Sequence, residues 1–310
     1  MEKEYYIIPK KHLFQFENID LYEEKLDGFV LYRKGDSTNK INLENKAVPD
    51  TIYANPDDIK DKKLLNVIED VNALQVYKNY NSNLIDCINS ENITDVKKVL
   101  VNIMDYTLKN PRSGNLQQLP KTIDVLIGEY MEKPEILKNL NQISNKDYTT
   151  SIHIINTMGL MLSYSIHTKK KEIANRGFTA LIHDIGKIEI PDEILMAPRK
   201  LSAEEFKVIQ SHPKMGHKIL LNMGITDSMI LDGTIQHHEK LDGSGYPYKK
   251  LNLSNIGKEM AIIDIYEALT AVRPYKKSFD SFVALKIIKK DVKRNQLDLK
   301  IFEKFVYSLL

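Results

Sequence analysis

Apolar side chains recur at intervals of three and four residues through most of the second half of this chain, and that spacing constrains the fold more than any other feature. The interval places apolar groups along one face of an α-helix, and such a face has to pack against other helices. The sequence therefore predicts an all-helical domain. The segments with this spacing are residues 123–130, 134–143, 147–167, 172–183, 203–210, 213–223, 227–238, 258–272, 279–293 and a last short one beyond residue 298.

The first part of the chain has a different pattern. Residues 5–8 and 28–33 carry the β-branched and aromatic side chains typical of strands, followed by turn residues at 34–37 and a short apolar-polar alternation at 40–43. From about residue 57 to 110 the helical interval returns. We predict a smaller mixed α/β domain here. Because it has neither a glycine-rich nucleotide loop nor an acidic phosphoacceptor cluster, we interpret it as a regulatory or dimerisation domain.

Helix-breaking and helix-capping residues mark the boundaries of these segments. Residues 111–114, Pro-Arg-Ser-Gly, are polar and rich in helix breakers, so they divide an N-terminal domain, residues 1–113, from the helical domain, residues 114–310. A chain of 310 residues is long enough for two domains with separate cores. Ser202 followed by Glu205 matches a capping box, which predicts that a helix begins there.

Composition narrows the partners and the location. The formal net charge is +2, so the chain lacks the field that would favour a nucleic acid polymer as partner. Cys87 is the only cysteine, which excludes a disulfide framework and favours a reducing compartment. The N-terminal residues lack the apolar core of a signal peptide, and no run of about 18 apolar residues occurs. We predict a cytoplasmic protein without a membrane span.

The histidines gather in the helical part of the chain. Of the eight, only His12 lies outside residues 152–239. His183 and Asp184 stand side by side in the motif LIHDIGKIEIP, residues 181–191, at the end of an apolar helical run. These two side-chain types readily bind a divalent metal through nitrogen and oxygen. Taken alone, the pair is weak evidence for a metal, because many such pairs form helix-end hydrogen bonds.

Two residues after this pair extend the metal hypothesis. Gly186 can adopt a positive φ and so end the helix close behind the pair. Lys187 then lies where its ammonium group can reach a phosphate that the metal holds. The motif therefore predicts a metal site that binds a phosphate.

Other helical segments carry further ligand-type side chains, each with an ordinary alternative. His153 is consistent with a core histidine, His212 with a helix cap, and the pair His237 and His238 with a polar helix end. Asp264 is harder to explain in this way, because a carboxylate among isoleucines needs a partner when it is buried. Together with the histidine–aspartate pair, these residues predict a site for two divalent ions, which Asp184 is well suited to bridge.

Two features could form the wall of such a site. Residues 241–248, LDGSGYPY, form a tight loop whose amides can face a ligand, and Tyr246 offers a ring for stacking. Alone, the loop is a turn. Arg273 ends the segment that contains Asp264, where Pro274 stops the helix, so its guanidinium could clamp a phosphate or simply complement the helix dipole.

The combined motifs resemble the HD-GYP family, the bacterial cyclic di-GMP phosphodiesterases of the HD superfamily. The resemblance covers roughly residues 122–310. It implies an all-helical domain, a cofactor of divalent metal ions, most often iron or manganese, and hydrolysis of the 3'-5' phosphodiester bond of cyclic di-GMP to pGpG or on to GMP. The motifs are HDIGK at 183–187, IPDEIL at 190–195, His212-Pro213 with Gly216, HHEKLDGSGYP at 237–247 and DIYEALTAVRPY at 264–275.

The resemblance also implies roles for individual residues. Asp184 and Lys187 are expected to be catalytic, with a hydroxide between two metal ions attacking the phosphorus while Lys187 takes up charge on the phosphate oxygens. The implied substrate contacts are Lys187, Gly245, Tyr246, Pro247 and Arg273. The implied metal ligands are His153, His183, Asp184, His212, His237, His238 and Asp264.

The chain departs from the family pattern at two positions. Some members carry a glutamate four residues before the first ligand histidine, where it supports a third metal, and here that residue is Thr149. We therefore predict two metal ions. Glu267 stands where the family usually has a second aspartate, and because the charge is kept we expect little loss.

Other functions remain open at this level. The same pocket could serve a non-catalytic signalling module that binds a cyclic dinucleotide, or a phosphodiesterase for another cyclic dinucleotide. A second copy of the chain, a diguanylate cyclase or an effector protein remains open as a protein partner. The lysines of residues 276–304 alternate with apolar residues, so they indicate a solvated helix face rather than a nucleic-acid patch.

Overall fold

The computed structural model describes residues 5–8, 13, 16, 18–25, 28–35, 51–60, 62–90, 93–109, 116, 118–132, 150–197, 199–271 and 278–309. The chain divides into two compact units, Met1–Tyr80 and Asn81–Leu310. The boundary between them along the sequence falls within helix α1, Lys62–Asn89. The predicted boundary at residues 111–114 lies outside the described residues. It stays a prediction, although the two units divide earlier along the chain.

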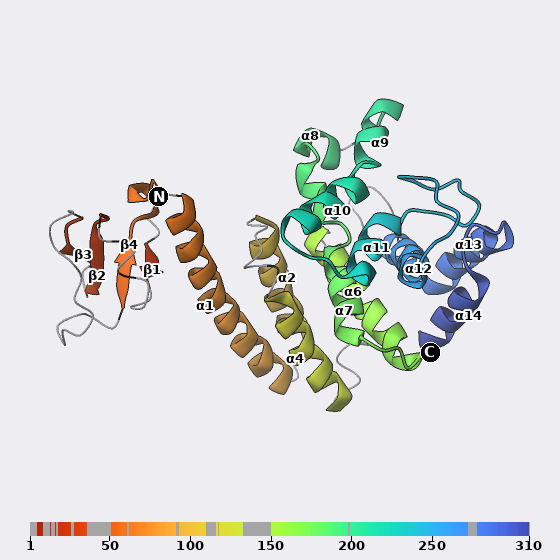
Figure 1. The fold of residues 1–310 in the computed structure, drawn as a ribbon. Coiled ribbons are helices and arrows are strands. Elements are labelled where there is room, and N and C mark those ends of the chain that lie inside the picture. The colour runs from red at the N-terminus through yellow and green to blue at the C-terminus, as the bar shows by residue number, and fades with distance from the viewer. Residues whose placement is uncertain are drawn as a thin grey trace. The chain divides into compact units, whose positions relative to one another are not determined.

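The first unit contains a four-stranded antiparallel sheet, drawn in red and orange in Figure 1. Two of its strands, β1 and β3, coincide with the strands predicted from aromatic and β-branched residues. The alternation at residues 40–43 lies outside the described residues. The strands are β1 Tyr6–Ile8, β2 Leu21–Lys25, β3 Gly28–Arg33 and β4 Ile52–Ala54, in the order β1-β4-β2-β3, and the 3₁₀ turn η2, Pro56–Asp58, follows them.

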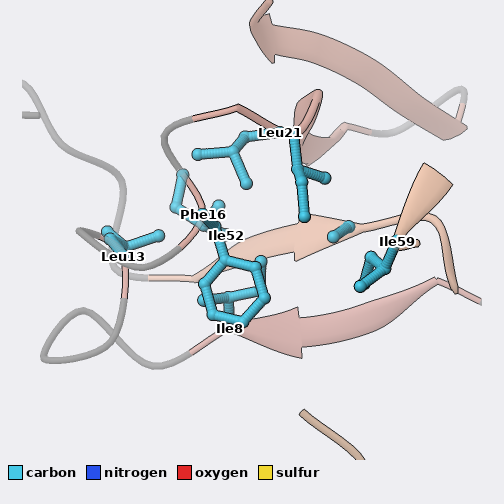
Figure 2. Close-up of a cluster of buried hydrophobic side chains, with 8 residues drawn as sticks. Ile8, Leu13, Phe16, Leu21, Ile52 and Ile59 are labelled. Atoms are coloured by element: carbon cyan, nitrogen blue, oxygen red, sulfur yellow. The ribbon is translucent and has the colours of Figure 1, made fainter. Parts of the chain in front are cut away.

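One face of this sheet carries the core of the first unit, shown in Figure 2. In β4, Ile52 and Ala54 are buried while Tyr53 between them is half-buried, because successive side chains of a strand point to opposite faces. The side-chain amide of Asn72 on α1 bonds the backbone of Ile7 in both directions, at 3.0 and 3.1 Å, and so satisfies β1 beyond its pairing with β4. The buried cluster consists of Ile8, Leu13, Phe16, Ile19, Leu21, Ile52, Ala54 and Ile59.

The described residues of the second unit form helices and connecting turns, without a strand, which confirms the predicted helical domain. The helix predicted at residues 134–143 lies outside the described residues. None of the described helices has both the length and the apolar character that a membrane crossing requires. The elements are α2 Ile93–Lys109, α4 Leu119–Glu132, α6 Thr150–His167, α7 Ile173–Ile182, η3 Ile185–Glu189, α8 Asp192–Leu195, α9 Ala203–Ile209, α10 His212–Asn222, α11 Ser228–Gln236, α12 Asn255–Thr270, α13 Ser281–Lys293 and α14 Leu299–Ser308.

Helices α6 and α12 form the centre of this unit. Both bury most of their residues, and they pack against each other, with α7 on α6 and α11, α13 and α14 on α12. A helix that is apolar all round belongs in such a position. Each nevertheless carries a polar group in its buried part, His153 on α6 and Asp264 on α12. The fold therefore places ligand-type side chains inside the domain.

Local capping explains where several helices begin. The Ser202 hydroxyl accepts the Glu205 N–H at 3.1 Å, and the Glu205 carboxylate accepts the Ser202 N–H at 2.8 Å, which confirms the predicted capping box of α9. Ser254 caps α12 in a similar way by accepting the N–H of Gly257 at 3.2 Å. These caps satisfy amides that have no partner within the helix.

Candidate metal centre

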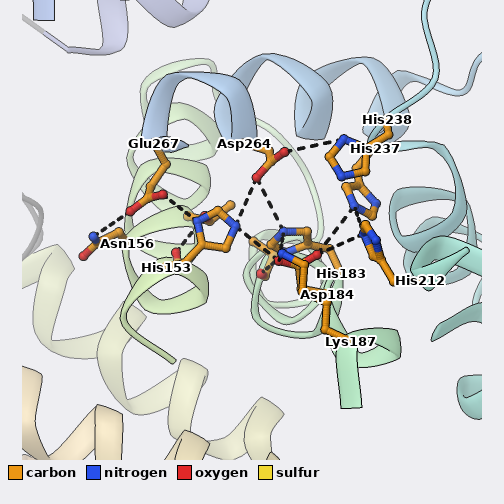
Figure 3. A network of polar contacts seen from close by, with 12 residues as sticks. His153, Asn156, His183, Asp184, Lys187, His212, His237, His238, Asp264 and Glu267 are labelled. Carbon is orange, nitrogen blue, oxygen red and sulfur yellow. Dashed lines mark hydrogen bonds and ion pairs between the residues drawn. The ribbon is translucent and has the colours of Figure 1, made fainter. Parts of the chain in front are cut away.

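The seven predicted metal ligands come together from separate elements of the second unit. His153 lies on α6 and Asp264 on α12, while the pair His183 and Asp184 follows α7. His212 opens α10, and His237 and His238 follow α11. Figure 3 shows these side chains pointing toward one another. Residues more than a hundred positions apart in the sequence therefore share one site.

A first cluster consists of His153, His183 and Asp184, all buried, whose ligand atoms lie within 4.8 Å of one another. Asp184 Oδ2 is 3.4 Å from His153 Nε2 and 3.5 Å from His183 Nε2. Asp264 Oδ1 adds a second carboxylate, 3.1 Å from His153 Nε2 and 3.7 Å from His183 Nε2. Two imidazoles and two carboxylates thus face one point.

A second cluster consists of His212, His237 and His238, whose ligand atoms also lie within 4.8 Å of one another. The other oxygen of Asp184, Oδ1, is 3.1 Å from His212 Nε2 and 3.7 Å from His237 Nε2. Asp184 therefore presents one oxygen to each cluster, which is the arrangement of a bridging carboxylate.

The backbone orients three of the histidines. The Nδ1 atoms of His183, His212 and His237 lie 2.7 to 2.8 Å from the carbonyl oxygen of the residue three positions earlier. A carbonyl only accepts, so each Nδ1 donates to it, and each ring turns its Nε2 atom toward the site. These carbonyls are available because the helix around each one ends there.

The clusters have unsatisfied acceptors that fit a cation. His212 Nε2 and His237 Nε2 lie 3.0 Å apart, and two lone pairs at that distance repel unless positive charge lies between them. Among the residues that the structure describes, His183 Nε2 and Asp184 Oδ1 are buried without a hydrogen-bond partner. Buried acceptors of this kind are costly to leave unpaired. A set of imidazole and carboxylate donors suits divalent transition metals, so the two buried clusters are consistent with a binuclear metal site.

Charge states in the site match this donor set. Burial raises the pKa of Asp184, but Lys187 and His183 outweigh it, so that pKa lies well below its usual value and the carboxylate is ionised. Burial lowers the pKa of His237 well below its usual value and that of His238 to about 3, so both rings are neutral. Ionised carboxylates and neutral imidazoles are the forms that bind metals.

The pKa of His153 shifts in the opposite direction to those of His237 and His238. Burial lowers its pKa, but hydrogen bonds with Asp184, Asp264 and Glu267 outweigh that effect and raise it well above the usual value. The three surrounding carboxylates therefore attract positive charge to this side of the site.

The sequence did not reveal two residues that position His153: Glu267, which contacts it, and Asn156, which acts through Glu267. Glu267 Oε2 lies 2.5 Å from His153 Nδ1, and Asn156 donates its amide to Glu267 Oε1 at 2.8 Å. Glu267 was noted only as a departure from the family pattern. Its signal was its position three residues after Asp264, on the same face of α12, as Asn156 follows His153 on α6.

The predicted substrate residues lie partly at the site. Lys187 Nζ is 2.5 Å from Asp184 Oδ2, and its side chain is 23% exposed, so it stands between the buried clusters and solvent. The ring of Tyr246, in the loop with Gly245 and Pro247, packs against His238 with the ring centres 4.6 Å apart. Arg273 and Thr149 lie outside the described residues.

Comparison with protein families gives one model match. The family described as the HD domain matches residues 131–301. All seven predicted ligands lie within that range, so the match covers the whole candidate metal centre.

Curated relatives match a similar region. A cyclic di-GMP phosphodiesterase of Pseudomonas aeruginosa is 29% identical over 191 residues, which are 60% of this chain and 46% of that protein. The 3'3'-cGAMP-specific phosphodiesterase 1 of Vibrio cholerae is 36% identical over 130 residues, which are 41% of this chain and 30% of that protein. The matched part therefore spans less than half the length of these relatives.

A solved structure matches the fold along nearly the whole chain. Bd1817, an HDG"Y"P protein from Bdellovibrio bacteriovorus, has a TM-score of 0.60 with 97% of this chain and 98% of that chain covered. The sequences are 17% identical, so the likeness concerns the fold alone. It supports the predicted architecture of a mainly helical chain with a small N-terminal sheet.

Proposed function

Because this chain belongs to the HD domain family, we propose that it is a metal-dependent phosphodiesterase of the HD-GYP group that hydrolyses cyclic di-GMP to pGpG or on to GMP. The observation that carries the proposal is the bridging position of Asp184, with one oxygen toward each cluster. A carboxylate so placed would hold two cations, and pairs of cations hydrolyse phosphate diesters in many enzymes.

We assign the metal-binding role to the seven clustered residues and expect iron or manganese in the cell. The first ion would be held by His153, His183, Asp184 and Asp264, and the second by Asp184 with the three remaining histidines. When bound, such ions supply a water nucleophile that is ionised near neutral pH, and positive charge for the phosphate.

The chain's own groups have separate tasks in this proposal. Lys187 is the cation nearest to Asp184 on the solvent side, so its ammonium can donate to a phosphate oxygen at the mouth of the site. The loop of Gly245, Tyr246 and Pro247 forms the wall beside His238, where the tyrosine ring can contact a base. Arg273 is proposed as a further clamp on the phosphate.

A second candidate is a phosphodiesterase for another cyclic dinucleotide. The Vibrio cholerae relative described as specific for 3'3'-cGAMP is 36% identical over 130 residues of this chain, and the Pseudomonas aeruginosa relative is 29% identical over 191 residues. Both substrates present the same phosphodiester to the metals and differ in one base. Discrimination between them would therefore depend on the loop of Gly245, Tyr246 and Pro247, which can contact a base. A non-catalytic module that binds the nucleotide without cleaving it is the third candidate.

The decisive experiment is turnover by the purified protein loaded with manganese. Incubation with cyclic di-GMP and, separately, 3'3'-cGAMP is expected to yield pGpG faster than the corresponding product of the hybrid nucleotide. Faster cleavage of 3'3'-cGAMP would support the second candidate, and binding without cleavage of either would support the third.

Variants test the assigned roles. Asp184→Ala is expected to lose bound metal and turnover together, while Lys187→Ala keeps its metal and turns over more slowly. Lys304→Ala, on the exposed face of α14, is the matched control and should behave as wild type. An Asp184→Ala protein that retained both metal and activity would remove the mechanism.

Elemental analysis is expected to find two metal ions per chain.

A further inference from the structure

A buried carboxylate stands next to the metal clusters without facing them. Glu239 directly follows His238, and its side chain is only 2% exposed. Its two oxygens accept backbone N–H groups from the loop that follows: Oε1 from Tyr248 at 2.6 Å and Oε2 from Lys250 at 3.1 Å. Bonds from a charged acceptor to two amides are stronger than neutral ones, so this carboxylate holds the middle of the loop firmly.

The same loop lies directly on the backbone around Glu239. The Tyr246 N–H donates to the His238 carbonyl oxygen at 3.1 Å. A Cβ added to Gly245 would lie 2.5 Å from both the His238 oxygen and the Lys240 nitrogen. A side chain has no room there, because the two stretches of backbone touch.

This attachment places the loop against the metal clusters. The Tyr246 ring packs against the His238 ring, with the ring centres 4.6 Å apart and the ring planes tilted by 32°. Burial raises the pKa of the Tyr246 hydroxyl, and the charges of Asp264 and Asp184 raise it further, so the hydroxyl is neutral and within electrostatic range of both carboxylates.

Other residues hold the ends of the loop. Gln236 Oε1 accepts the N–H of Ser254 at 2.8 Å and its hydroxyl at 3.1 Å, where α12 begins. Near the start of the loop, Lys240 donates to the side chain of Gln296 at 3.0 Å. Loss of the Glu239 carboxylate would therefore release the middle of the loop while its ends, and helix α12, stay in place.

We propose that Glu239 is a positioning residue that clamps the Tyr246 loop onto His238, so that the substrate wall and the second metal cluster form one rigid body. Its effect on substrate rests on the proposed function, whereas its effect on the loop does not. The clamp acts through Tyr248 and Lys250, and no part of it coordinates metal. Substrate binding, rather than metal binding, should depend on it.

The first test measures the loop itself in the full-length, manganese-loaded protein. In Glu239→Ala both amide bonds are lost, and the N–H groups of Tyr248 and Lys250 should exchange with deuterium about tenfold faster or more. Glu239→Gln keeps the size of the side chain, but its NH₂ group faces one of the two N–H groups, so one amide should lose protection. Unchanged exchange at both amides in Glu239→Ala overturns the clamp.

The second test measures metal and substrate. Both variants should keep the wild-type metal content and show KM for the cyclic dinucleotide raised about tenfold, with kcat changed much less. Glu303→Gln, an exposed glutamate of α14, is the matched control. Loss of metal in Glu239→Gln would assign Glu239 to the metal site instead. If wild type cleaves no cyclic dinucleotide, the proposed function fails, and amide exchange alone decides the clamp.

Discussion

Lys97 lies buried near Glu267, the carboxylate that orients His153. Lys97 on α2 is 2% exposed, and burial lowers its pKa to about 8 against the opposing charge of Glu267. An ammonium group in such a place is costly, because little water remains to solvate it. Near neutral pH the buried charge therefore makes the folded chain less stable than a neutral group would.

Replacement of Lys97 should reveal how much its buried charge destabilises the folded chain, because that destabilisation depends on pH. Between about 8 and the unfolded value of about 10.5, the unfolded chain holds a proton on Lys97 that the folded chain has lost. The free energy of unfolding of wild type then rises with pH, by up to roughly 1.4 kcal/mol per unit. Lys97→Met has no such proton, so wild type gains stability relative to it. Urea unfolding from pH 7 to 10 measures the difference.

The neighbouring lysine offers a control. Lys98 lies on the exposed side of α2 and pairs with Asp95 at 3.0 Å. Lys98→Met should stay parallel to wild type over the same pH range. A difference between wild type and Lys97→Met that does not change with pH would contradict the buried ammonium.

At the scale of elements, a close approach of two backbones assembles the site. Gly186 in η3 faces the start of α10, where an added Cβ would lie 2.0 Å from the His212 oxygen and 2.5 Å from the Gly216 nitrogen. These glycines bring η3 against α10, so that Asp184 Oδ1 reaches His212 Nε2 at 3.1 Å. The prediction that Gly186 takes a positive φ and ends the helix is wrong: α7 ends at Ile182, and Gly186 lies within η3 without a positive φ. The glycine is needed instead for this close contact.

A methyl group at this contact should separate the two elements. For Gly186→Ala we expect a loss of roughly 2 to 3 kcal/mol in the free energy of unfolding, because the obstacle is backbone and cannot rotate away. Metal affinity should fall as well, since Asp184 moves from His212. Chemical denaturation and metal titration measure the two effects.

Gly128 on α4 is the matched control. It lies in a helix with no atom within 4 Å of an added Cβ. Gly128→Ala should raise the free energy of unfolding by about 0.5 to 1 kcal/mol, because alanine loses less backbone entropy in a helix. Wild-type stability and metal affinity in Gly186→Ala would show that the contact tolerates a side chain.

At the scale of the whole molecule, the predicted metal ligands belong to one of the two compact units. The seven clustered residues all lie in Asn81–Leu310, while the sheet of β1 to β4 lies in Met1–Tyr80. A ligand that binds only the folded state stabilises the unit that contains its site. Bound metal should therefore stabilise the second unit more than the first.

Removal of metal by a chelator is expected to destabilise the second unit. At a metal concentration a hundred times the dissociation constant, the stabilisation that is lost amounts to about 2.7 kcal/mol. Hydrogen exchange resolved by segment should show faster exchange in α6, α10 and α12, with β2 and β4 as internal references that do not change. Equal acceleration in the sheet and the helices would contradict a site confined to the second unit.

Much of the site could be predicted because its ligands are conspicuous in the sequence. Asp264 stands among isoleucines, and the pair His237 and His238 precedes a glycine-rich loop, so each is visible from its neighbours. The helical interval likewise predicted the second unit, since a period of three and four residues is a local property. In the first unit, β2 and β4 were missed, because β4 is three residues long and β2 carries three charged residues among its five.

Local sequence thus determined which segments are helical and which side chains can bind metal, because periodicity and side-chain chemistry are set by near neighbours. Tertiary structure alone decided which oxygen of Asp184 turns to each cluster, that Glu267 contacts His153, and that the Glu239 carboxylate accepts two backbone N–H groups of the loop. Those roles depend on which groups meet across the fold. Distances between residues far apart in the chain are set by packing, and no local pattern records them.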